Sequence, residues 1–220
     1  MRKYNHKRLF IYLAILILPV LKGTEVVHGD EGSTIKGEVI ILDSRGEKNE
    51  DRSHVVVFLD RVNNNDISRA TPKPMYISQK DRRFTPRVLA VTKGTTVHFP
   101  NDDTIFHNVF SLSRSQPFDL GIYKQGNSKT VTFTKPGLVR VYCNLHPMMM
   151  ANILILDNPY FTVTDKQGTF TIPNVPDGKY LLRIWHEFGD EIRKEISVSG
   201  TTSTDDLQFT IQETRTKVTH

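Results

Sequence analysis

The strongest constraint on this 220-residue chain is that apolar and polar residues alternate in short segments, and no helical period follows residue 29. Alternation is typical of strands that bury one face, and Gly, Pro, Asn and Asp separate the segments. Many such strands at close spacing predict an all-β chain folded as sandwiches or barrels. The candidate strands are Ile35–Leu42, His54–Asp60, Met75–Gln79, Arg87–Thr92, Thr95–Phe99, Asn108–Ser111, Lys129–Phe133, Leu138–Cys143, Ala151–Leu156, Tyr160–Thr164, Thr169–Ile172, Lys179–Trp185, Glu191–Ser197 and Leu207–Gln212.

The first 29 residues have a different character from the rest of the chain. Four basic residues lie within the first eight positions, and the 13-residue segment Leu9–Leu21 is apolar. This combination is typical of a secretory signal, whereas a membrane-spanning helix needs about 20 apolar residues. We therefore expect residues 1–29 to be a signal peptide that exports the chain to a bacterial periplasm, with an uncleaved membrane anchor as the alternative.

The positive charge of the chain is concentrated in that segment. The formal net charge is +5, and the five basic residues and single Glu of residues 1–29 account for four of these charges. The remainder is almost neutral, so its charge gives no reason to propose a nucleic acid as a partner.

The chain contains one cysteine, Cys143. Exported domains usually pair their cysteines in disulfides, so a lone cysteine is inert, reactive or bound to a metal. Cys143 ends the predicted strand Leu138–Cys143 and opens a loop that contains His146 and Met149. These neighbours favour metal ligation over inert burial. A nucleophile needs a base held by a third group, and the sequence nominates no such group.

His107, at the start of an earlier predicted strand, completes a set of four donors. A thiolate, two imidazoles and a thioether are ligands that copper prefers, and two histidines, one cysteine and a weak axial sulfur form an electron-transfer site. The sequence thus predicts one copper ion (Cu2+/Cu+) bound by His107, Cys143, His146 and Met149. If the strands of His107 and Cys143 are neighbours in opposite sheets, both side chains reach one end of a barrel.

All four predicted ligands fall within residues 75–157, a segment with enough short strands to close a small domain. Part of this segment resembles the plastocyanin and amicyanin branch of the cupredoxins, and the Cys-x-x-His-Pro-x-Met loop is closest to amicyanin. The resemblance covers about residues 84–157 and implies a Greek-key β-sandwich with one blue copper. The segments that carry it are Gly94–Phe99, His107–Val109, Thr132–Gly137 and Tyr142–Met149.

The resemblance also implies roles for individual residues. His107, Cys143 and His146 would be equatorial ligands, and the His-Pro-x-Met spacing selects Met149 as the axial ligand. Asn108 would tie its strand to the cysteine loop, a supporting role around the metal.

In cupredoxins the histidine of the loop forms the port through which electrons pass. Here that port would be His146, within an apolar patch that includes Pro147, Met148 and Met150. An exposed apolar patch suits a small, short-lived docking interface.

Two functions remain open from the sequence. One is an exported type 1 (blue) copper protein that carries single electrons between partners such as a cytochrome c and a periplasmic dehydrogenase. The alternative is a periplasmic copper chaperone or storage protein, which the Met148–Met150 triplet favours slightly. No histidine flanks Cys143, so the His-Cys-His bridge of multicopper oxidases and copper nitrite reductases is missing, and we expect no enzyme.

A second domain is predicted around the first. Residues 159–186 alternate between turns, such as Asp177-Gly178, and inward-facing apolar residues, and they resemble the carboxypeptidase-regulatory-like (transthyretin-like) sandwich. That immunoglobulin-like sandwich normally begins with strands like those predicted before residue 60. We therefore expect the copper domain to be inserted into a sandwich made of residues 33–70 and 158–213, followed by a tail, 214–220. The alternative is that 33–70 adds strands to the copper domain.

Overall fold

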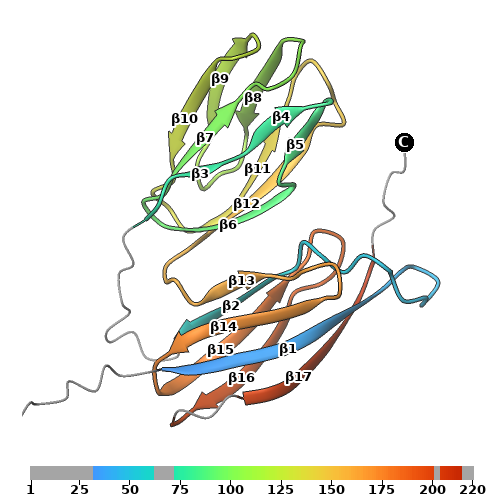
Figure 1. The fold of residues 1–220 in the computed structure, drawn as a ribbon, viewed down its shortest axis with the longest axis vertical. Helices are drawn as coiled ribbons and strands as arrows, with labels where there is room; N and C mark the ends of the chain where they lie inside the picture. Colours follow the sequence, from blue (N-terminus) through green and yellow to red (C-terminus); the bar gives the residue numbers. More distant parts are fainter. Residues whose placement is uncertain (1–31, 62–71, 201–203, 215–220) are drawn as a thin grey trace, which may run out of the picture.

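A computed structural model of the chain describes residues 32–61, 72–200 and 204–214 (Figure 1). The predicted signal peptide, residues 62–70 and the tail beyond Thr214 lie outside the described residues. No helix in the described part is long and apolar enough to span a membrane. The elements are β1 (Ser33–Leu42), β2 (Val56–Arg61), β3 (Met75–Tyr76), β4 (Ser78–Lys80), β5 (Arg83–Thr85), β6 (Val88–Thr92), β7 (Thr96–Pro100), β8 (His107–Ser111), β9 (Phe118–Tyr123), β10 (Ser128–Thr132), β11 (Gly137–Tyr142), β12 (Met150–Leu156), β13 (Phe161–Val163), β14 (Thr169–Val175), β15 (Gly178–Trp185), β16 (Ile192–Val198) and β17 (Thr204–Gln212).

Strands β3–β12 form one β-sandwich, the upper body in Figure 1. One sheet has the order β10-β7-β3, the other has the order β6-β12-β11-β8-β9, and β4 pairs with β5 as a hairpin. Alternation explains the core, because β7 buries Val97 and Phe99 while β11 buries Val139 and Val141. The predicted all-β fold is confirmed. A single cluster of buried apolar side chains forms the core between the sheets of the upper sandwich.

The second sandwich, the lower body in Figure 1, is built from both ends of the chain. Its sheets have the orders β14-β1-β17 and β13-β2-β15-β16. Thus β1 and β2, which precede the first sandwich, pair with strands that follow it. Within the described residues no ladder joins β1 or β2 to β3–β12. This is the pairing expected of an insertion, and not that of the alternative.

The two sandwiches share a third apolar cluster. Val56 and Phe58 of β2 pack against the outer face of β6 and β12, which presents Val88, Ala90 and Leu154. Beside this cluster the Arg87 guanidinium forms a bidentate ion pair with the buried carboxylate of Glu187, at 2.6 and 3.2 Å. The Asn152 amide donates to the same carboxylate at 2.9 Å. Apolar burial and a partly buried ion pair therefore join the two sandwiches.

Three strands differ from the sequence expectation. The predicted strand Met75–Gln79 divides into β3 and β4, and β4 continues into the unpredicted strand β5. Strand β9 was also not predicted, because Asp119 and Gly121 interrupt its apolar pattern. Gly121 has a φ of 67°, which is accessible to glycine without strain. Both additions contribute to the end of the sandwich that holds the candidate site.

Candidate metal centre

The site lies where β8 begins and β11 ends. His107 is the first residue of β8, and Cys143 follows the last residue of β11. These two strands are antiparallel neighbours in the same sheet, with Tyr142 opposite Phe110. The condition considered from the sequence, that these strands are neighbours in opposite sheets, is therefore not met in the structure. Adjacent antiparallel strands bring the start of one beside the end of the other, so both side chains still reach one end of the sandwich.

The structure brings three of the four predicted ligands into one cluster. The Nδ1 atoms of His107 and His146 are 3.1 Å apart, and the Cys143 Sγ atom lies 3.9 Å and 3.7 Å from them. Three donors around one ion at about 2.0–2.3 Å in a trigonal plane are roughly 3.6 Å apart. His107 and Cys143 are buried, while His146 is partly exposed. The cluster therefore has the spacing and the chemistry of a three-donor metal site.

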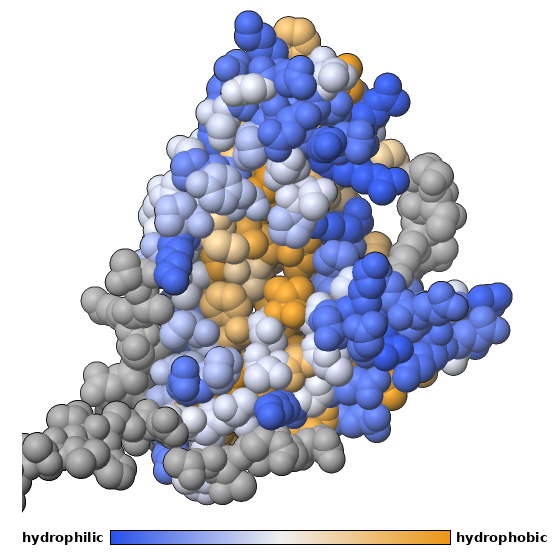
Figure 2. All heavy atoms as spheres, viewed as in Figure 1, coloured by the Kyte–Doolittle hydropathy of each residue, from blue (hydrophilic) through white to orange (hydrophobic). Residues whose placement is uncertain are grey.

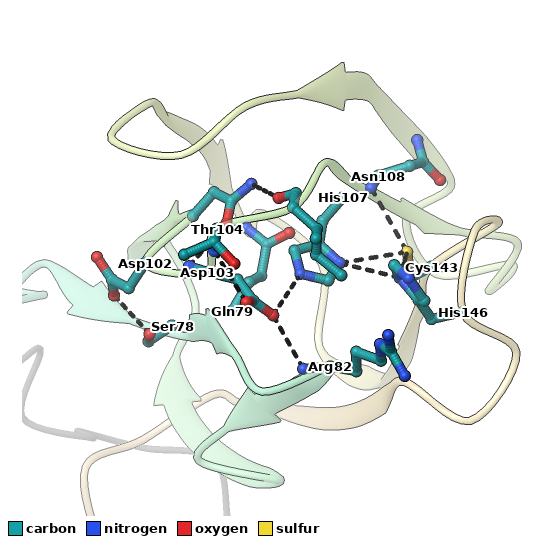
Figure 3. A network of polar contacts seen from close by, with 12 residues as sticks. Ser78, Gln79, Arg82, Asp102, Asp103, Thr104, His107, Asn108, Cys143 and His146 are labelled. Atoms are coloured by element: carbon teal, nitrogen blue, oxygen red, sulfur yellow. Dashed lines mark hydrogen bonds and ion pairs between the residues drawn. The ribbon is translucent and has the colours of Figure 1, made fainter.

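Asp103 fixes the orientation of the His107 ring (Figure 3). Its Oδ2 atom lies 3.0 Å from His107 Nε2, so a proton on Nε2 leaves Nδ1 free to face the cluster. The same oxygen accepts a hydrogen bond from the Arg82 backbone N–H at 3.0 Å. Donation from Arg82 and then from His107 lowers the pKa of Asp103. The carboxylate is thus charged at neutral pH, as are many carboxylates that orient metal-binding histidines.

Asn108 links the strand of His107 to the cysteine loop. Its backbone N–H points at Cys143 Sγ over 3.5 Å, and its side-chain oxygen accepts from the Asn144 N–H at 3.3 Å. Its amide nitrogen donates to Asp119 of β9 at 2.8 Å. The backbone of Asn108 thus contacts the sulfur, and its amide holds the loop against β8.

The side chains of the loop after Cys143 differ in how far they are exposed to solvent. The Met149 N–H donates to the His146 carbonyl at 2.9 Å, which closes a tight turn. Met149 is 1% exposed and belongs to the same core cluster as Cys143. Met148 is 54% exposed, Pro147 is exposed, and Met150 is half-buried at the start of β12. The Met triplet therefore presents one side chain to the core and another to solvent.

Electrostatics at the cluster favour a neutral loop histidine. Burial lowers the pKa of His146, and the charges of His107 and Arg82 lower it further. A neutral imidazole is the form that binds a metal ion. The three donors can therefore bind at neutral pH without an added cost of deprotonating His146.

The sequence interpretation missed three residues that support this end of the sandwich. Asp103 and Arg82 form the contacts described above, and Gln79 donates to the Tyr123 hydroxyl at 2.6 Å behind them. Burial raises the pKa of Tyr123 to about 12, and its hydroxyl donates to the Phe99 carbonyl at 2.8 Å. The one available signal was the Asn-Asp-Asp-Thr segment four residues before His107, since carboxylates often orient metal-bound histidines.

Two family models match the chain. Residues 74–157 match the model described as copper binding proteins of the plastocyanin/azurin family. Residues 156–207 match the model described as polysaccharide lyase family 4, domain II, a name that differs from the predicted transthyretin-like sandwich. The chain thus contains a cupredoxin domain of the plastocyanin/azurin type, together with a second β domain. A search of curated proteins finds no match.

Solved structures similar to the chain each cover less than half of it. A purple cupredoxin from Nitrosopumilus maritimus is 23% identical over 37% of this chain and 99% of its own, with a TM-score of 0.35. A reduced Cu(I) form of an amicyanin variant is 20% identical over 41% of this chain and 97% of its own, with a TM-score of 0.36. A copper-containing nitrite reductase from Thermus scotoductus is 26% identical over 46% of this chain and 26% of its own, with a TM-score of 0.38.

Proposed function

We propose that the chain is an exported type 1 copper protein that carries single electrons, with His107, Cys143 and His146 as equatorial ligands and Met149 as the axial ligand. The observation that carries this proposal is the convergence of two imidazole nitrogens and one thiolate within 3.1–3.9 Å. This donor set suits copper in an electron-transfer site. The bound ion would supply the one-electron Cu(II)/Cu(I) couple.

The protein residues would hold the donors in place for both oxidation states. Asp103 orients His107, and Asn108 holds Cys143 and its loop against β8. Burial of His107 and Cys143 in a packed core limits their movement. A site that changes little between oxidation states suits electron transfer better than a site that reorganises.

Electrons would enter and leave through His146. Its ring is partly exposed, and the neighbouring Leu145 and Met148 are 44% and 54% exposed. This apolar surface would dock redox proteins such as a cytochrome c or a dehydrogenase in the periplasm. The proposal of export rests on the basic and apolar segments within residues 1–29.

We infer an electron carrier rather than an enzyme or a copper store. Each side of Cys143 in the sequence lacks a histidine, so no bridge to a second copper is present at that position. Met148 is 54% exposed and Met149 is 1% exposed. The triplet therefore does not present its sulfurs together, as a copper-storage cluster would. A chaperone or store remains the alternative that the following experiment distinguishes.

The test is to load the protein with Cu(II) and to record visible absorption and EPR spectra. We expect an intense thiolate-to-copper band and a reversible one-electron potential, because Cys143 Sγ would bind the ion directly. Cys143→Ser should abolish the band, and His98→Gln, a histidine of β7 outside the cluster, should retain it.

Three results would contradict the proposal. A colourless Cu(II) adduct would exclude the type 1 centre, and wild-type colour in Cys143→Ser would exclude the thiolate ligand. Tight binding of Cu(I) with weak binding of Cu(II) and no reversible potential would instead support the chaperone or store.

A further inference from the structure

The β4–β5 hairpin holds a cationic side chain beside the candidate metal centre. Its strands pair Lys80 with Arg83, so the turn consists of Asp81 and Arg82 alone. These two residues have φ values of 51° and 56°. Positive φ at both central residues gives the type I′ turn, whose twist matches that of a hairpin. The turn therefore has a defined shape and is a suitable element on which to fix a side chain.

One carboxylate oxygen, Asp103 Oδ2, links the hairpin to the candidate metal centre through hydrogen bonds. Asp103 Oδ2 accepts both the Arg82 backbone N–H and the His107 Nε2–H at 3.0 Å. Figure 3 shows the Arg82 side chain extending from this point on the same side as His146. The exposed Arg82 cation, anchored through its backbone, thus lies at the rim of the proposed electron port.

Further exposed cations surround Arg82. Lys80 and Arg83 flank the same turn, and Lys124 follows the end of β9, which pairs with the start of β8. None of these four cations forms an ion pair within the described part of the chain.

The exposed carboxylates at this end are fewer than the four cations. Asp103 is 12% exposed and bonds to His107, while Asp102 accepts a hydrogen bond from Ser78 at 2.5 Å. Asp81, in the turn itself, is exposed. Four exposed cations therefore face two exposed carboxylates, Asp81 and Asp102, so the surface that a partner would meet beside the port is positive on balance.

An apolar area completes this surface. Phe106, directly before His107, is 56% exposed, and Leu145 and Met148 lie on either side of His146 in the loop. Exposed large apolar side chains gathered at one site are typical of docking surfaces. The surface therefore combines an apolar centre with a cationic rim on the hairpin.

We propose that Phe106, Leu145, Met148 and the hairpin tip around Arg82 form one docking surface for a redox protein with acidic side chains around its own electron-transfer site. This rests on the proposed electron-carrier function and adds the charge of the partner. Complementary charge mainly accelerates association and orients the encounter, so its effect appears in rates at low salt.

The experiment measures oxidation of the copper-loaded, reduced protein by two small oxidants of opposite charge, hexacyanoferrate(III) and tris(phenanthroline)cobalt(III). Each accepts one electron, so Cu(I) becomes Cu(II) while Fe(III) becomes Fe(II) or Co(III) becomes Co(II). The variants are Arg82→Gln, which keeps the backbone N–H bond to Asp103, and Arg114→Gln as the matched control. Arg114 is an exposed arginine in the loop between β8 and β9, at the opposite end of the sandwich from His107.

We expect Arg82→Gln to slow oxidation by the anion and to accelerate oxidation by the cation, by about two- to fivefold each at low ionic strength. Both effects should shrink in about 0.5 M salt, because the Debye length falls to a few ångströms. Arg82→Lys should retain wild-type rates, and Arg114→Gln should change neither rate.

Two outcomes would overturn the proposal. The rate constants of Arg82→Gln could change in the same direction with both oxidants, which would indicate a change in potential rather than in docking charge. Arg114→Gln could also change them as much as Arg82→Gln, which would indicate a general effect of net charge. A wild-type protein that shows no blue colour after copper loading is a separate result, because it would refute the proposed function itself.

Discussion

Replacing Asp103 by Asn should change the reduction potential of the proposed copper centre while keeping its expected blue colour. The carboxylate Oδ2 atom lies 3.0 Å from both His107 Nε2 and the Arg82 backbone nitrogen. An asparagine side-chain oxygen in the same position can still accept both hydrogen bonds. The substitution therefore removes a charge beside a buried histidine and leaves the geometry of the ligand largely unchanged.

The magnitude follows from the difference between charged and neutral hydrogen bonds. A bond to an ionised group contributes about 1.5–3 kcal/mol, against about 0.5–1.5 kcal/mol for a neutral pair, so the loss is about 1 kcal/mol. The negative charge stabilises Cu(II) more than Cu(I), so its removal should raise the potential. Since a tenfold change in a one-electron equilibrium is about 59 mV, the loss corresponds to a rise of about 40 mV.

The assay is redox titration of the blue band in the wild type, Asp103→Asn and Asp102→Asn. Asp102 is the matched control, because its side chain bonds to Ser78 and not to a proposed ligand. Cu(II) affinity measured by chelator competition should also fall in Asp103→Asn, by about fivefold for a loss of about 1 kcal/mol. An unchanged or lowered potential in Asp103→Asn, or an equal rise in Asp102→Asn, would refute the assigned role of the carboxylate.

Three further predictions concern the axial ligand, a buried turn and an acidic turn. Met149→Leu should keep the blue colour and raise the potential, because the axial sulfur tunes it; Met148→Leu and Met150→Leu should change it little, and equal shifts in all three would show that the axial assignment is wrong. Gly168→Ala should destabilise the protein by at least about 2 kcal/mol more than Gly46→Ala in urea unfolding. Both glycines have φ near +80°, but an added Cβ would meet the Val39 carbonyl at 2.2 Å only at Gly168, so similar losses would contradict the clash. Hydrogen bonds from Thr169 lower the pKa of Asp165 below 3.8, so its contribution to stability is present above that value and is lost as pH falls through the lower folded pKa. Asp165→Asn should therefore lower the melting temperature at pH 7 and have no effect well below pH 3.8; a constant difference across this range would exclude the charge as the cause.

The ligand cluster could be predicted from the sequence because its residues are chemically distinctive and close in the chain. Cys143 and His146 lie three positions apart on one loop, and copper's preference for soft donors brings His107 into the same set. Strand pairing was harder to predict from the sequence. Placement of His107 and Cys143 in one sheet depends on the register between β8 and β11, which alternation within each strand does not determine.

The supporting residues around the cluster were not predictable for a different physical reason. Asp103 and Arg82 lie outside the strands, where alternation marks no position as functional, and only the carboxylate of Asp103 near His107 offered a chemical signal. The β4–β5 hairpin consists of two three-residue strands in which Phe84 is the one apolar residue, so it has almost no apolar pattern. Such residues gain their role only from contacts made by the folded chain.

The insertion of one sandwich into the other has a mechanical consequence. A domain joined by one linker can swing about it, but this copper-type domain is connected to its neighbour at both of its ends and is also held by the Arg87–Glu187 pair. The loop of His146 lies at the far end of β11 from the Pro136–Leu138 segment, which lines a hollow between the sandwiches together with Trp185 (Figure 2). A partner that binds and holds the second sandwich would therefore also set the direction in which the proposed electron port faces.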